Sequence, residues 1–282
     1  ATSIIVPIAI GSSSSNEESP ILAKRQLNEV HKPFNSGDLT PVGDGFRKGI
    51  REFATDFATL TSDGDSNNIF SPLSIATAFG MAYEGANGTT KAEMETIFHD
   101  GLDKEEFQRM LLSNAKDVEE KTPDGEVYRS YYLDIGQAFF ADNGFLSYSQ
   151  SNNDEVFEAY LKTITDYFYA EAYSGALNSD EMHQALADWI NLKTKDFFHL
   201  EGDAFETLEG VLWLVNSIYL KTQWLDKNGV TVDHLFHNAN ESSVTNSFHS
   251  HGATCYENEG LEVYTIPLFG SLSFRRSEEH TS

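Results

Sequence analysis

Apolar residues recur with helical spacing in several stretches of the chain. In residues 46–60, and again in residues 156–168, an apolar side chain returns every three or four positions. These positions are Phe46, Ile50, Phe53, Phe57 and Leu60 in the first stretch, and Val156, Phe157, Tyr160, Leu161, Ile164 and Phe168 in the second. Each stretch therefore predicts an amphipathic helix that buries one face against a core.

Short polar side chains indicate where other helices begin. Ser71 followed by Pro72 has the chemistry of an N-cap with proline at the first helical position, and the residues that follow are apolar or small nearly all round to Tyr83. This pattern predicts a buried helix, which we expect Gly85 to end in the left-handed conformation. Three further pairs have the spacing of a capping box: Thr90 with Glu93, Asp103 with Glu106, and Asn178 with Glu181.

Strands are predicted between these helices and throughout the last part of the chain. The stretch "YYLDIGQAFFADNGF" predicts a strand that ends in a turn at residues 142–144. The stretch "VLWLVNSIYL", residues 211–220, is apolar without alternation, which is typical of a strand buried on both faces. From Thr231 onward the pattern predicts short β-segments joined by turns. The chain therefore combines helices and strands in an α+β fold.

The composition argues against several classes of partner. Among 282 residues there are 19 Lys and Arg against 44 Asp and Glu, which gives a formal charge of -25. Nucleic acids and anionic membrane surfaces both attract a positive protein face, so we expect no nucleic acid and no membrane as a partner. Cys255 is the single cysteine, so no disulfide forms within the chain. No apolar run is long enough to span a bilayer.

Four stretches, taken in order, resemble motifs of the serpin family. "NIFSPLSIATAFGMAYEGANGTTKAEM" is similar to the family's N-I-x-x-S-P-x-S-I helix and the G-A-x-G-x-T turn after it. "ADWINLKTKDFF" resembles the N-x-W-V-x-x-x-T helix segment, although Ala187-Asp188 departs from its leading Asn. "LVNSIYLKTQW" resembles L-V-N-A-I-Y-F-K-G-x-W with Thr222 in place of Gly, and "YTIPLFGSLSF" resembles L-P-Y-x-G-x-x-x-S-M. The likeness spans residues 46–274.

The resemblance implies a fold and a division of the chain. The fold expected is serpin-like α+β, with a bundle of helices packed on a large central mixed or antiparallel sheet and smaller sheets in addition. We expect residues 45–275 to be the N-terminal portion of such a domain, because the family's reactive-centre loop follows the position of "PLFGSLSF". Residues 276–282 resemble a translated sequencing adapter and are interpreted as an artefactual tail. Residues 1–44 are interpreted as a leader remnant and a disordered linker, with a disordered N-terminal extension as the alternative to a leader.

The resemblance also implies a function. Inhibitory serpins are suicide substrates of serine proteases, and sometimes of cysteine proteases. The protease attacks an exposed loop and forms an acyl-enzyme, and it is distorted when the cleaved loop inserts into the main sheet. The expected partner is therefore a protease. We expect no catalytic residue, cofactor or metal, a reactive bond outside this chain, and a monomeric full-length protein. The alternative is a non-inhibitory serpin-like protein, such as a carrier, chaperone or storage protein.

Four residues are candidates for the sheet-opening machinery. Asn216 lies in the middle of an apolar strand, where an unpaired amide costs about 1 to 3 kcal/mol, so it needs polar partners. By resemblance these partners are Ser71 and Ser74, and the three residues form the family's "shutter". Trp224 matches the "breach", where the loop first enters the sheet. The ordinary alternatives are a helix cap for Ser71, a core hydrogen bond for Asn216 and an apolar anchor for Trp224.

Two sequons and a group of histidines complete the candidates. Asn87-Gly88-Thr89 and Asn240-Glu241-Ser242 are N-glycosylation acceptors if the protein is secreted. We expect an extracellular protein, with the cytoplasm as the alternative location. Four histidines and the cysteine also lie close in sequence, but polar residues of β-turns explain them better than a zinc site does. They are His234, His237, His249, His251 and Cys255.

Overall fold

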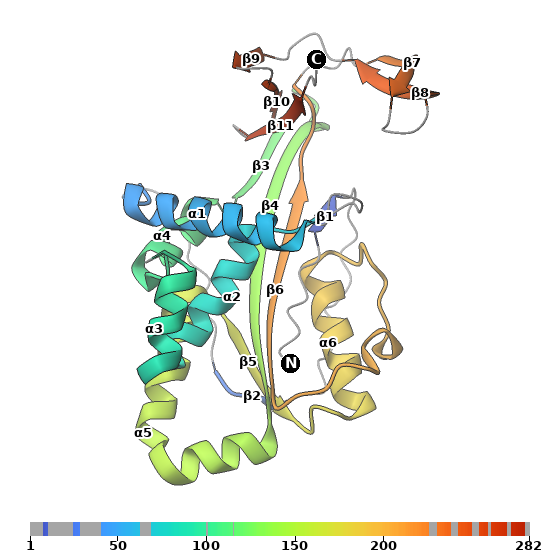
Figure 1. Cartoon of the computed structure of the whole chain (residues 1–282). Coiled ribbons are helices and arrows are strands. Elements are labelled where there is room, and N and C mark those ends of the chain that lie inside the picture. Colours follow the sequence, from blue (N-terminus) through green and yellow to red (C-terminus); the bar gives the residue numbers. More distant parts are fainter. Residues whose placement is uncertain are drawn as a thin grey trace. The chain divides into compact units, whose positions relative to one another are not determined.

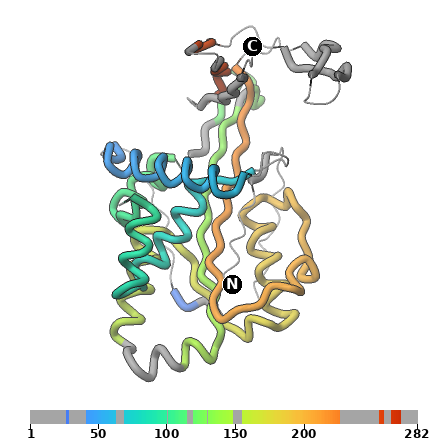
Figure 2. The backbone as a smooth tube through the Cα atoms, in the orientation of Figure 1, coloured from blue at the N-terminus to red at the C-terminus, as the bar shows by residue number. Residues whose placement is uncertain are grey.

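The protein is seen here in a computed structural model, which describes residues 8–10, 25–28, 41–62, 69–99, 101–114, 116–225, 230–237, 242–249, 254–258, 261–269 and 272–279 (Figure 1). Figure 2 traces the path of the backbone in the same orientation. The chain divides into two compact units. The first comprises residues 1–116 and 133–220, and the second comprises residues 117–132 and 221–282. All described helices belong to the first unit, and the second consists of strands and their connections in its described part.

A mixed sheet with strand order β1-β6-β4-β5-β2 organises the first unit (Figure 1). Its long strands are β4 (Val127–Asp142) and β6 (Leu212–Lys221), which confirms the two strands predicted from the sequence. Strand β5 (Glu171–Gly175) runs parallel to β4. The short strand β1 (Ile8–Ile10) pairs in parallel with Ile218–Leu220 of β6, and β2 (Arg25–Gln26) pairs antiparallel with β5.

One face of this sheet is covered by helices that bury their apolar stripes. Phe139 of β4, Ala172 of β5 and Leu214 of β6 contribute to the same core from the sheet. The stripes predicted from the sequence are confirmed, except that Leu60 and Val156 are 85% and 64% exposed. The helices on this side are α1 (Asp44–Thr61), α2 (Pro72–Gly85), α3 (Gly88–Ile97), α4 (Lys104–Asn114) and α5 (Asn143–Phe168).

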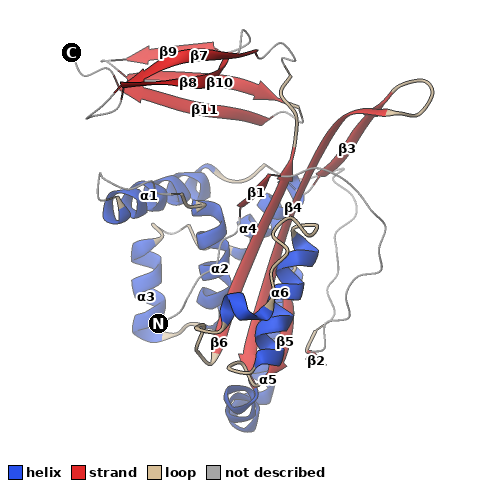
Figure 3. Cartoon of the chain, turned by 90° about the vertical axis from the view of Figure 1, so that its right-hand side faces the viewer, coloured by secondary structure: helices blue, strands red, loops and turns tan. Residues whose placement is uncertain are grey.

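The opposite face of the sheet carries α6 (Asp180–Lys193), which Figure 3 shows in front of the strands. Together with the 3₁₀ turn Gly202–Phe205, it forms a second core against Phe140 of β4 and Trp213 of β6. Neighbouring residues of β4 and β6 therefore contribute to different cores, because side chains alternate along a strand. The sheet is buried on both faces in this region, as the unbroken apolar run of β6 predicts.

The predicted left-handed conformation at Gly85 and the predicted start of α3 at Thr90 are wrong. Helix α2 does extend to Gly85, but its C-cap is Ala86 in an extended conformation, and the glycine with positive φ is Gly88, at 59°. Helix α3 then begins at Gly88 with Asn87 as its N-cap, three residues before Thr90. The reason is that the Asn87 side chain accepts a hydrogen bond from Gly88 N at 2.7 Å, so α3 is capped there and needs no threonine cap.

Two other predicted boundaries are also corrected, and one is confirmed. Asp142 is the N-cap of α5 and accepts a hydrogen bond from Gly144 N at 2.8 Å, so residues 142–144 begin a helix instead of forming a turn. Ser179, and not Asn178, caps α6, because the Asn178 side chain accepts from Gly210 N at 3.3 Å. Asp103 caps α4 as predicted and accepts from Glu106 N at 3.0 Å.

The second unit contains small antiparallel sheets, which confirms the short β-segments predicted from Thr231 onward. One is the hairpin of β7 (Val230–His237) and β8 (Ser242–His249), and the other has strand order β11-β10-β9. Strand β3 pairs with β4. The remaining bounds are β3 (Lys116–Lys121), β9 (Thr254–Asn258), β10 (Leu261–Leu268) and β11 (Leu272–Glu279).

The α+β class, with a large mixed sheet, packed helices and smaller sheets, is confirmed. The division of the chain into a leader, a domain portion and a tail stays a prediction. Most of residues 1–44 lie outside the described residues, and their described parts include β1 and β2. The first residues of the predicted tail belong to β11, whose pairing with β10 continues to Glu279, opposite Leu261.

Gly80 allows α2 to pack closely against α4 and α5, and its replacement tests that packing. A Cβ there would lie 2.7 Å from a ring carbon of Phe107 and 2.8 Å from one of Phe168. We predict that Gly80→Ala lowers the free energy of unfolding by about 1 to 3 kcal/mol in chemical denaturation, because buried rings must move. The matched control is Gly45→Ala in α1, where nothing lies within 4 Å, and it should be neutral or stabilising. Equal effects of the two variants would contradict the close packing.

Candidate functional site

Asn216 lies completely buried in the middle of β6. Two residues earlier on this strand, Leu214 belongs to the core that α2 helps to form, so Asn216 lies on the same face of the sheet. Gln137 of β4 is also buried, two residues before Phe139 of that core. Two amide side chains from neighbouring strands therefore face one apolar core.

The two amides bind each other. Asn216 Nδ2 donates a hydrogen bond to Gln137 Oε1 at 3.2 Å, and we call these two residues the amide pair. Among the described residues, neither expected serine bonds to Asn216: Ser71 Oγ accepts from Ser74 N at 3.2 Å, and Ser74 Oγ has no hydrogen-bond partner. A neighbouring strand brings a facing side chain to within about 5 Å, which explains why β4 supplies the partner.

Gln137 is a functional candidate that the sequence reasoning missed. The signal was present, because Gln137 is the single amide in the otherwise apolar or small stretch "IGQAFFA". A buried polar side chain in such a stretch needs a partner for the same reason as Asn216 does. Two isolated amides in two apolar strands therefore indicate a cross-strand pair, if the strands are neighbours.

Polar atoms around the amide pair are only partly satisfied. Within the described residues, Asn216 Oδ1, Gln137 Nε2 and Ser74 Oγ are buried without a hydrogen-bond partner. Each such atom costs about 1 to 3 kcal/mol unless water or another polar group binds it. This part of the core therefore has unused donors and acceptors on β4, β6 and α2.

Trp224 lies in the second unit and forms an antiparallel bridge with Leu268. The two residues before Trp224 make further hydrogen bonds to Phe269: Phe269 N donates to Gln223 O and Thr222 Oγ1 donates to Phe269 O, both at 2.8 Å. The Trp224 side chain is 39% exposed. The segments "TQW" and "PLF" are thus bound together, while the breach role of Trp224 stays a prediction.

The two sequons differ in what the structure describes. Asn87 is exposed as the N-cap of α3, and its Oδ1 accepts from Gly88 N at 2.7 Å. Asn240 lies outside the described residues. Its use, like that of Asn87, stays a prediction.

Within the described residues, the histidine group gives no candidate metal site, and no helix is a candidate membrane span. In the β7–β8 hairpin, His234 is opposite Thr245 and His237 is opposite Ser242, while His251 lies outside the described residues. The described residues contain no group of three ligating side chains placed to hold a metal ion. Over the same ranges, no helix combines the length and hydropathy needed to cross a bilayer.

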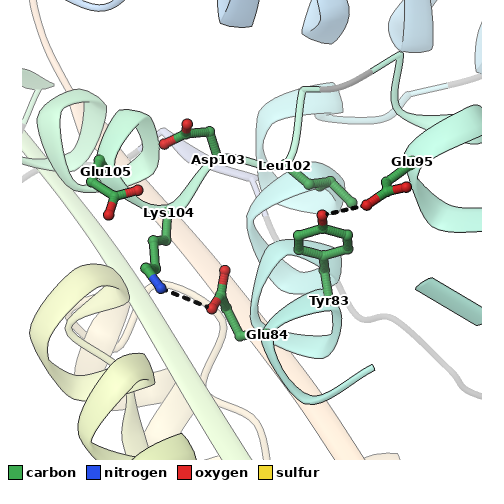
Figure 4. A pocket seen from close by; sticks show the side chains of 7 residues that line it. All are labelled: Tyr83, Glu84, Glu95, Leu102, Asp103, Lys104 and Glu105. Carbon is green, nitrogen blue, oxygen red and sulfur yellow. Dashed lines mark hydrogen bonds and ion pairs between the residues drawn. The ribbon is translucent and has the colours of Figure 1, made fainter. Parts of the chain in front are cut away.

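A polar pocket of about 340 Å³ lies where the end of α2 meets the start of α4 (Figure 4). Lys104 Nζ lies 3.3 Å from a Glu84 carboxylate oxygen, and the Tyr83 hydroxyl donates to Glu95 at 2.7 Å. Burial acts to lower the pKa of Lys104, but the Glu84 carboxylate outweighs it and raises that pKa. These groups bind each other, so the pocket supports no ligand assignment.

The amide pair generates a testable prediction about stability. Asn216→Leu leaves the Gln137 amide wholly unpaired, and we expect the free energy of unfolding to fall by about 1 to 3 kcal/mol. The double variant Asn216→Leu/Gln137→Met removes both polar groups and should lose less than the sum of the two single variants. Chemical denaturation of all four proteins measures the coupling. Strict additivity would show that the two amides do not depend on each other.

Comparison with known proteins gives a consistent result. The family model described as "Serpin (serine protease inhibitor)" matches residues 48–275. An uncharacterized serpin-like protein of Thermococcus kodakarensis is 26% identical over 237 residues, which is 78% of this chain and 50% of that protein. Neuroserpin of Mus musculus is 32% identical over 170 residues, which is 57% of this chain and 36% of that protein. The chain thus spans half or less of the length of these curated relatives.

Solved structures agree at the level of the fold. The thermophilic serpin tengpin in its native state superposes with a TM-score of 0.65 at 17% identity, covering 86% of this chain and 59% of that one. Emu ovalbumin gives a TM-score of 0.63 at 18% identity, covering 83% of this chain and 63% of that one. The family match over residues 48–275 and the shared fold lead to one conclusion: the chain belongs to the serpin family.

Proposed function

We propose that the protein is a serpin-type suicide-substrate inhibitor of serine proteases, with cysteine proteases as the second class of target. Membership of a family described as serine protease inhibitors supports a protease-inhibitor function in general. The class of target protease and the suicide-substrate mechanism are our proposal. The partner is then a protease, and the protein acts as its trapped substrate instead of as an enzyme.

The observation that carries this proposal is the edge of β6. In the described part of the sheet, β4 pairs along one edge of β6, and β1 lies at the other edge only opposite Ile218–Leu220. Leu212–Ser217 therefore have no strand beside that edge within the described residues. Unpaired backbone groups along a strand edge readily accept an added strand. This geometry supports insertion of a cleaved loop next to β6.

The amide pair supports the same proposal. Asn216 and Gln137 join β6 to β4, and unused polar atoms remain on both side chains. For a strand to be added at the other edge of β6, β4 and β6 must stay together. A cross-strand hydrogen bond holds that pair of strands, and the unused atoms offer partners to an arriving polar group.

The test of inhibition uses the full-length protein and a panel of trypsin-like, chymotrypsin-like and subtilisin-like proteases. We expect at least one protease to give an adduct that survives denaturant, because the acyl bond is covalent. The cleaved protein should also melt at a higher temperature than the intact one. A protease whose nucleophilic serine is replaced by alanine is the control and should give no adduct. Clean cleavage by every protease, with no gain in thermal stability, would favour the non-inhibitory carrier or chaperone alternative.

We further propose that the protein is extracellular and glycosylated at Asn87. The exposed position of this side chain supports the proposal, because the transferase needs access to the amide nitrogen. Expressed in a secretory eukaryotic host, the protein should lose mass on treatment with an N-glycosidase, and Thr89→Ala should remove the contribution of Asn87. Asn240→Gln tests the second sequon separately. A mass that the glycosidase leaves unchanged would argue for the cytoplasmic alternative.

A further inference from the structure

A buried ionic network joins α6 to the sheet. Glu171 of β5 accepts hydrogen bonds from three side chains: Lys193 Nζ and Trp189 Nε1 of α6, and the Tyr173 hydroxyl of β5. The distance from Trp189 Nε1 to Glu171 Oε2 is 3.3 Å. The side chains of Glu171 and Lys193 are 14% and 11% exposed. Both charges are therefore largely removed from water and depend on each other.

Lys193 reaches Glu171 across Gly136 of β4. A Cβ on Gly136 would lie 3.1 Å from both Cγ and Cδ of Lys193, and 3.3 Å from a ring carbon of Trp189. Strand β4 lies between β6 and β5 in the sheet. The missing side chain at Gly136 thus leaves room for the aliphatic stem of the lysine to cross β4. The Lys193 side chain of α6 therefore packs on β4 and binds Glu171 of β5.

The charges in this network are strongly coupled. Burial acts to raise the pKa of Glu171, but Lys193, with help from Tyr173 and Trp189, outweighs it and lowers that pKa. These three are the groups that act on Glu171 from α6 and β5, and its register partner on β4, Ala138, carries no ionisable group. Burial and the Glu171 carboxylate together raise the pKa of Tyr173, so its hydroxyl remains a donor.

The rest of the α6 interface is mostly apolar. The His183 ring stacks on Trp213 of β6, with ring centroids 5.7 Å apart, and Leu186 and Ile190 are buried in the same core. Apolar packing holds α6 on the sheet but does not by itself fix one position, because it is not directional. The Glu171–Lys193 ion pair does fix the position of α6, because it is directional and its lysine stem crosses β4 at Gly136.

We propose that Glu171 and Lys193 form a latch that controls whether α6 stays docked on the sheet, separately from the global stability of the unit. With both side chains charged and paired, α6 is held on β4 and β5. Loss of either partner leaves a buried charge without its counter-charge, so α6 separates from the sheet more often. This inference does not depend on protease inhibition.

The test is native-state hydrogen exchange on the 282-residue chain at neutral pH. We expect Lys193→Met to raise the opening equilibrium of the α6 amides by about tenfold or more, while α2 and α5 amides change by less than about twofold. Gly136→Ala should act in the same direction, because its Cβ displaces the lysine stem. The double variant Glu171→Gln/Lys193→Met, which leaves no unpaired charge, should open less than Lys193→Met alone.

Controls separate a latch from general destabilisation. Lys162 and Asp166 form an exposed ion pair within α5, so Lys162→Met is the matched control and should leave α6 exchange within about twofold. If Lys193→Met raises exchange equally in α2, α5 and α6, the network is only a global stabiliser and the proposal is wrong. Unchanged α6 exchange in Lys193→Met would overturn it as well.

The pH dependence of α6 opening provides an independent test. Because the folded-state pKa of Glu171 is below its unfolded value, near 4.3, the latch is complete above about pH 4.3 and is lost as the pH falls through the folded-state pKa. Exchange corrected for the intrinsic rate should therefore show α6 opening selectively in acid. Glu171→Gln should open to a similar extent at every pH in this range. An equal acid response in Glu171→Gln would assign the effect to other groups and contradict the latch.

Discussion

The structure depends on a sheet whose long strands are buried on both faces. Because side chains alternate along a strand, Phe139 and Leu214 fill the core that α2 helps to form, whereas Phe140 and Trp213 fill the core against α6. A polar side chain in the middle of β4 or β6 is therefore shielded from water, and leaving it without a hydrogen bond costs free energy. Asn216 and Gln137 reduce this cost by binding each other, and each keeps one unused atom.

The same constraint explains where charge enters the second core. Glu171 and Lys193 are tolerated because each neutralises the other, and Tyr173 and Trp189 donate to the same carboxylate. The amide pair joins strand to strand, and the Glu171–Lys193 pair joins helix to sheet. The proposed activity requires the sheet to accept a strand. During that change, the amide pair would hold β4 to β6, and the Glu171–Lys193 pair would hold α6 to the sheet.

Much of this arrangement could be predicted from local sequence, because it follows from local chemistry. The stripe ending at Phe168, the Ser71-Pro72 helix start and the apolar run of β6 each depend on neighbours in the sequence, and each was found where it was predicted. Helix ends were less predictable. Both Asn178 and Ser179 have side chains able to cap α6, and Asn178 instead binds Gly210 N, a contact over 32 residues. Competition between local and distant partners is decided only in the folded chain.

The sequence by itself determined the α+β class, the family and the need of Asn216 for a polar partner, because periodicity, ordered motifs and the cost of a buried amide are properties of the chain. Only the tertiary structure decided which group satisfies that amide. Gln137 lies 79 residues away in the sequence and becomes a neighbour because β4 pairs beside β6. The same holds for Glu171 and Lys193, which meet because the lysine stem crosses a glycine on β4. Strand order brings these side chains together, and strand order depends on contacts between residues that are far apart in the chain.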